Sequence, residues 1–162
     1  MFGPAAVFET ERGTKQEIKG DHLELRQQHR SVSLDQLGTV CIQMPAQEEV
    51  ERSHLPVLVE EYIRERIEVA LNFAGWLLDR VDPTHRLQEV ALVLSLAEAG
   101  YLGWRTRAED RRSPNSVPMG IGTRDGLTVH LHPPTRRREA LHQDVKRIAE
   151  DFTVLLRREK HG

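Results

Sequence analysis

The stretch VLVEEYIRERIEVALNFAGWLLDRV-DPTH-RLQEVALVLSLAEA, residues 57–99, decides the fold of this chain. Apolar residues in its first part recur every three or four positions, the spacing of one face of an α-helix. Asp82-Pro83 ends that helix, because the residue before a proline is pushed out of the helical region. The second part holds VALVLSLA, apolar almost all round, so we predict a second, buried helix capped by Asp82. Residues 46–100 are therefore predicted to contain a central helical hairpin.

Residues 1–45 favour strands, because apolar and polar residues alternate, as they do in TVCIQM at 39–44. We predict an antiparallel β-meander of about three to five strands, with one face against the helices. Cys41 lies in this alternation and is the only cysteine, so no internal disulfide is possible. We expect it to be a small buried hydrophobe and not a catalytic thiol.

The chain beyond the hairpin is expected to form three further pieces. Residues 101–116 are a polar, basic connection, and residues 117–132 form a β-hairpin with Asp125-Gly126 in its turn. An amphipathic helix is predicted over 135–159, capped by Thr135. Its apolar positions are Leu141, Val145, Ile148, Phe152 and Leu155. Strands and helices are segregated along the chain, which favours a single α+β domain.

Composition excludes few functions. The net charge is −2, which argues neither for nor against nucleic acid, and lysine occurs only at positions 15, 19, 146 and 160. The excess of arginine indicates a GC-rich, bacterial genome. No basic start is followed by an apolar core at the beginning of the chain, so we expect a cytoplasmic protein. The apolar runs are too short to span a membrane, so no membrane partner is expected. No dinucleotide fingerprint or Walker loop is present, and no cofactor is predicted.

Arginines are concentrated after residue 100 and suggest a surface for an anion. Planar guanidinium groups suit phosphate and carboxylate, so the partner would be nucleic acid or an acidic protein. Interspersed acidic residues leave the alternative of a solvated, partly self-neutralised surface. The candidate residues are Arg105, Arg107, Arg111, Arg112, Arg124, Arg136 and Arg137.

His130-Leu131-His132 is the clearest catalytic hint. Residues two apart on a strand share a face, so both imidazoles could hold one metal ion, with His142 or Asp144 as a third ligand. This pattern gives the alternative function, a small metal-dependent hydrolase acting on phosphate esters. The opposing interpretation is an exposed strand face with two polar side chains.

The first helix carries two apolar stripes, and one of them could face another protein or a second copy in a homodimer. The candidate interface residues are Tyr62, Ile63, Ile67, Phe73 and Trp76. Alternatively, the sheet and the last helix cover both stripes. Since no catalytic constellation is complete, we predict a non-catalytic interaction or regulatory domain that docks on another protein, with a basic loop for an anionic partner.

Overall fold

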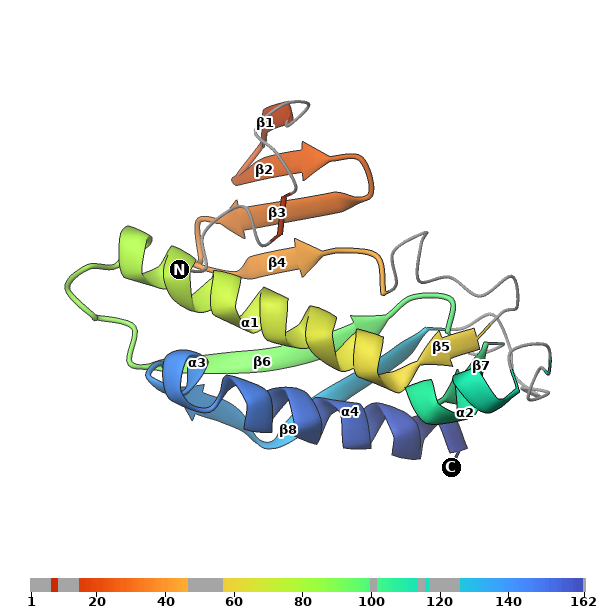
Figure 1. The fold of residues 1–162 in the computed structure, drawn as a ribbon. Helices are drawn as coiled ribbons and strands as arrows, with labels where there is room; N and C mark the ends of the chain where they lie inside the picture. Colours follow the sequence, from red (N-terminus) through yellow and green to blue (C-terminus); the bar gives the residue numbers. More distant parts are fainter. Residues whose placement is uncertain are drawn as a thin grey trace.

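The computed structural model describes residues 7–8, 15–46, 57–99, 102–113, 116 and 126–161. One long helix lies between an N-terminal sheet and a two-stranded ribbon that packs with the C-terminal helix (Figure 1). The predicted α+β class, with an N-terminal antiparallel meander and a C-terminal amphipathic helix, is confirmed.

The meander is a four-stranded antiparallel sheet whose strands follow one another in sequence order. Its first and last turns use glycine at positive φ, 60° at Gly20 and 85° at Gly38, whereas its middle turn has Gln28 there, with a φ of 50°. Val32 is buried towards the long helix, whereas Cys41 pairs with Ser33 on the opposite, polar face. The expectation that Cys41 is buried is therefore wrong: it is exposed. The strands are β1 (Lys15–Lys19), β2 (His22–Gln27), β3 (Arg30–Asp35) and β4 (Val40–Gln43).

The long helix α1 (Glu60–Val81) starts later than its apolar stripe predicts. The preceding residues form a buried strand, β5 (Val57–Val59), which pairs in parallel with β7 (Gly103–Arg105). Short helix α2 (Arg107–Arg112) follows β7. The predicted end of α1 at Asp82 is confirmed, since the Asp82 N–H donates to the Leu78 carbonyl oxygen at 2.9 Å.

The prediction of a second helix in the central hairpin is wrong, because this segment is strand β6 (Glu89–Leu96). Its even-numbered residues, such as Leu94, pack on the core, while odd-numbered residues such as Val93 face outward. A short apolar run suits a buried strand as well as a buried helix. Here a second strand, β8 (Leu127–Arg137), is available to pair with it. Asp82 does not cap a second helix: it is the C-cap of α1, and its carboxylate accepts the Leu87 N–H at 2.9 Å.

The partner of β6 is β8 (Leu127–Arg137), in antiparallel register. The first strand of the predicted hairpin at 117–132 lies outside the described residues; its second strand corresponds to the start of β8. The predicted end of this strand at residue 132 is wrong, because β8 continues through Pro133 and Pro134 to Arg137. The register shifts between the Ala91–Thr135 and Val93–His130 pairs, so both prolines lie where no ladder hydrogen bond is needed.

The C-terminal helix is α4 (Val145–His161), preceded by the short helix α3 (Ala140–Gln143). The predicted start at Thr135 is wrong, because β8 continues to Arg137. Its apolar face is confirmed: Val145, Ile148 and Phe152 are buried, as predicted.

Two apolar clusters lie on the two sides of α1. The larger joins α1 to α4 and the β6–β8 ribbon and contains Ile63, Ile67 and Leu131. The smaller joins α1 to the meander and contains Val32 and Phe73. The helix thus uses both of its stripes within the chain.

Candidate functional site

The predicted basic surface is divided between the two ends of α1. Arg107, the first residue of α2, lies beside the start of α1, and its backbone N–H donates to Glu61 at 2.6 Å. Arg136 and Arg137 precede Arg138, which binds Asp82 beyond the far end of α1. A helix of 22 residues is about 33 Å long, so the two groups do not form one patch. Arg124 lies outside the described residues.

Arg105 does not point into solvent. It is only 5% exposed and donates to the Ser113 carbonyl oxygen at 3.0 Å, to Ser116 Oγ at 3.1 Å and to Asp110 at 3.3 Å. These acceptors lie on and just after α2, so Arg105 holds that segment in place. Its position argues for a structural role instead of anion binding.

Arg107 is also engaged within the chain. Its guanidinium lies 4.6 Å from the centroid of the Tyr62 ring and donates to Glu65 at 2.9 Å. The hydrogen bond to Glu65 raises the pKa of Arg107 above its ordinary value. Two other predicted anion-binding residues on α2, Arg111 and Arg112, are exposed and form no such hydrogen bond or cation–π contact in the described part of the chain.

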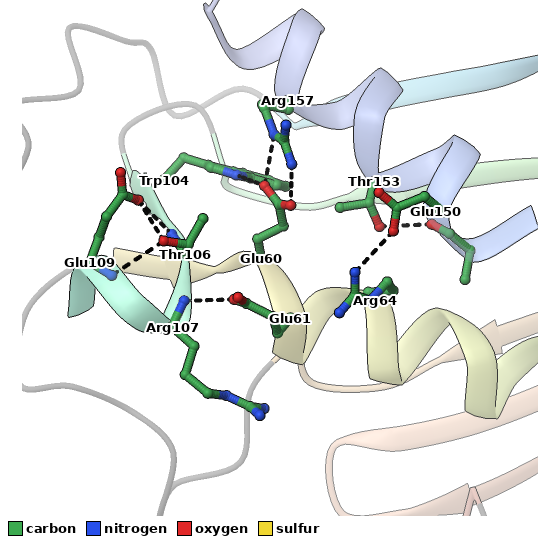
Figure 2. Close-up of polar contacts among 11 residues, drawn as sticks. Glu60, Glu61, Arg64, Trp104, Thr106, Arg107, Glu109, Glu150, Thr153 and Arg157 are labelled. Atoms are coloured by element: carbon green, nitrogen blue, oxygen red, sulfur yellow. Dashed lines mark hydrogen bonds and ion pairs between the residues drawn. The ribbon is translucent and has the colours of Figure 1, made fainter. Parts of the chain in front are cut away.

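A polar cluster fixes β7 and α4 to the start of α1 (Figure 2). Glu60 is buried, and its carboxylate accepts the Trp104 indole N–H at 2.8 Å and Arg157 Nε at 2.7 Å. Hydrogen bonding to Glu60 raises the pKa of Arg157. Both carboxylate oxygens of Glu60 accept hydrogen bonds from Trp104 or Arg157, so this cluster has the character of a structural junction.

A second polar cluster lies beyond the other end of α1. Arg138 is 2% exposed and donates to Asp82 at 2.9 Å and to Asp79 at 3.0 Å. The pKa of Asp82 is lowered, chiefly by the Leu87 N–H and with a smaller contribution from the Arg138 charge. His142 also contacts Asp79, at 3.2 Å. Asp79 in the last turn of α1 and Asp82 just beyond it therefore hold α3 and the residue that follows β8 in place.

The three predicted metal-binding histidines do not converge. His130 and His132 are both exposed, and His130 pairs with the outward-facing Val93 of β6, whereas His142 lies against α1 beside Asp79. Within the described ranges, no three His, Cys, Asp or Glu side chains are grouped so that they could hold a metal ion. The metal-dependent hydrolase stays a prediction without a preformed site at these residues.

A groove of about 550 Å³ brings some predicted residues together with others that the sequence did not single out. It lies between the second half of β8 and the first turns of α4. His132, Arg136, Arg137 and Asp144 line it, all of them candidates from the sequence. Sequence reasoning missed Glu89, Arg147 and Asp151; only the spacing of Asp144, Arg147 and Asp151 along one helix face could have indicated the latter two.

The predicted interface residues lie mainly in the interior of the chain. Ile63, Ile67 and Phe73 are each 5% exposed or less. Trp76 is half-buried in the smaller cluster beneath Arg80, and Tyr62 lies beneath Arg107. The chain itself therefore covers both apolar stripes of α1, which was the alternative to an interface. The sheet covers one stripe, and α4 and the ribbon cover the other.

The two most exposed large apolar side chains of the described residues, Ile18 and Leu37, both belong to the meander. Opposite pairs across the four strands place Ile18, Leu23, Leu34 and Val40 in one line on one face, which we call the apolar row. Val40 packs against α1, but Ile18 at the far end is 79% exposed. α1 therefore covers only part of this face.

Leu37, in the turn between β3 and β4, is 93% exposed. The turn is well defined, because the Asp35 carboxylate accepts the Leu37 and Thr39 N–H groups at 2.8 Å each. Hydrogen bonds from Thr39 are the main reason why the pKa of Asp35 is lowered. The turn thus holds a large apolar side chain in water next to the apolar row.

Comparison with known proteins identifies no relative: no family model, curated protein or solved structure matches the chain. Among the helices in the described ranges, none is long and apolar enough to cross a bilayer.

Proposed function

We propose that this chain is a non-catalytic interaction domain that docks on another protein through the apolar row and Leu37. One observation carries the proposal: the two most exposed large apolar side chains of the described residues, Ile18 and Leu37, lie at the same end of the meander, Ile18 beside the β1–β2 turn and Leu37 in the β3–β4 turn. Exposed apolar side chains gathered in this way mark interaction surfaces more often than scattered ones do.

Charge on the outer strand favours a different protein over a second copy. β1 is an edge strand of its sheet in the described part of the chain. Two β1 strands related by a twofold axis through Glu17 would place Glu17 opposite Glu17, and like charges directly opposite each other destabilise a sheet. Lys15 on the same strand is the kind of residue that discourages edge-to-edge pairing.

The proposal is tested with a double variant, Ile18→Thr and Leu37→Ser, compared with the wild type and with a control, Val93→Thr. All three positions are exposed, so each variant should fold like the wild type. In a quantitative pull-down, a true partner is expected to lose at least about tenfold in enrichment with the double variant and none with the control, because interface anchors cost more than about 1 kcal/mol each.

Equal enrichment of every captured protein on all three baits would contradict the proposal. A wild-type dimer in light scattering that becomes monomeric in the double variant would contradict the choice of a different protein and assign the surface to a homodimer. Nucleic-acid binding through the exposed arginines and the cytoplasmic location stay predictions from the sequence.

A further inference from the structure

The groove between β8 and α4 is open and is lined mostly by exposed polar side chains. Its volume of about 550 Å³ lies in the range of small-molecule sites. Pro133, Ala140 and Ile148 give it an apolar part, and the remaining lining is mostly charged. The charged residues are Glu89, His132, Arg136, Arg137, Asp144, Arg147 and Asp151.

These charged side chains do not neutralise one another. Across the described part of the chain, Arg137 and Arg147 form no ion pair or hydrogen bond through their side chains, and Arg136 donates only to the carbonyl oxygens of Pro133 and Thr135. The three carboxylates of the groove also form no ion pair there. At the two polar clusters, by contrast, Arg138 and Arg157 each bind carboxylates.

The two walls of the groove carry both signs of charge. Asp144 directly precedes α4, and Arg147 and Asp151 lie in its first two turns, so an arginine stands between two carboxylates about 10 Å apart along the helix axis. The opposite wall carries Arg137, paired across the ribbon with Glu89. A bare anion would be repelled by the carboxylates, and a bare cation by the arginines.

We propose that this groove binds a diphosphate group together with Mg²⁺. Arginine presents a planar fork of donors that matches phosphate, which suits Arg137 and Arg147. Mg²⁺ usually takes one or two carboxylates from the protein and fills its shell with phosphate oxygens and water. Such an ion needs only one groove carboxylate, in keeping with the lack of three convergent ligands in the described ranges.

This inference goes beyond the docking function and is independent of it. The groove lies on the ribbon and α4, whereas the apolar row lies on the meander across α1. The Ile18→Thr and Leu37→Ser variant should therefore bind the diphosphate like the wild type, so either proposal can fail alone.

The test is calorimetric titration of the whole chain with pyrophosphate and with ADP, each with MgCl₂ and with EDTA. Both ligands are expected to bind with Mg²⁺ and at least tenfold more weakly with EDTA. Tighter binding of ADP would assign the site to nucleoside diphosphates, and equal binding to the diphosphate group alone. No binding of either ligand with Mg²⁺, or equal binding with EDTA, would overturn the proposal.

Two double variants locate the site. Arg137→Gln with Arg147→Gln should weaken binding at least tenfold, whereas Arg111→Gln with Arg112→Gln on α2 removes the same charge elsewhere and should not. Asp144→Asn with Asp151→Asn should remove most of the dependence on Mg²⁺. Circular dichroism checks that each variant is folded. Equal affinities of both arginine variants, or an unchanged dependence on Mg²⁺ in the aspartate variant, would overturn the assignment to this groove.

Discussion

Single residues at the start of α1 illustrate how burial sets the value of an ion pair. The Glu60 side chain is 8% exposed and has two partners, Trp104 and Arg157. The nearby pair of Arg64 and Glu150, at 2.9 Å, is 34% and 49% exposed. Water solvates the second pair and screens its attraction, whereas Glu60 must be satisfied by the protein.

We therefore expect Glu60→Ala to lower the free energy of unfolding by about 2–3 kcal/mol, because the Trp104 indole N–H loses its acceptor and Arg157 its counter-charge. Arg64→Ala, the matched control, should cost less than about 1 kcal/mol. Urea denaturation of the two variants measures the difference. Similar losses in both would show that the Glu60 cluster is not the junction described above.

At the scale of single residues, the sequence pattern does not reveal which groups a side chain contacts. The roles of individual residues could therefore be predicted only in part. Arg105 was expected in an anion site, yet it is buried because α2 turns the chain back over it. The sequence does contain a signal for that turn. Thr106 and Glu109 form a capping box, the reciprocal hydrogen bonding of a helix start, and the spacing Thr-x-x-Glu is readable without a structure.

At the scale of elements, β6 is the part that sequence reasoning placed in the wrong class. Its apolar run is eight residues long, a length at which periodicity does not separate a buried strand from a buried helix. By contrast, α4 shows a clear helical period over 17 residues and was predicted correctly except for its start. Long periodic segments are therefore predictable, whereas short apolar runs depend on what pairs with them.

The strand assignment makes a direct prediction for adjacent residues. Val93 is 59% exposed, so Val93→Lys should cost no more than about 1 kcal/mol, the span of strand propensities. Leu94 packs on the larger cluster, so Leu94→Lys should cost about 2 kcal/mol or more through lost apolar burial.

Thermal unfolding followed by circular dichroism compares these two variants. In a helix buried all round, both lysines would be damaging. Equal destabilisation at positions 93 and 94 would thus contradict the alternation of β6.

At the scale of the whole molecule, the two clusters on either side of α1 differ in size. Among the described residues, the larger holds 16 buried members, while the smaller, beneath the meander, holds four. Regions with few buried apolar contacts open at lower free energy than the rest of a protein. The meander should therefore open while α1, α4 and the ribbon remain folded.

Hydrogen–deuterium exchange tests this order. Amides of β2 and β3 are expected to exchange faster than those in the middle of α4, and Val32→Ala should speed exchange in the meander alone. Leu131→Ala, a truncation in the larger cluster, should speed exchange throughout. Uniform protection across the wild-type chain would contradict separate opening of the meander.

The position of Cys41 has a practical consequence. It is the only cysteine of the chain, it is exposed, and it lies on the polar face of the meander, opposite the face that carries the apolar row. A maleimide fluorophore or spin label therefore attaches at one native position without mutagenesis. Such a probe sits on the sheet that is proposed to dock, on the side away from the docking residues, and would report the approach of a partner without blocking it.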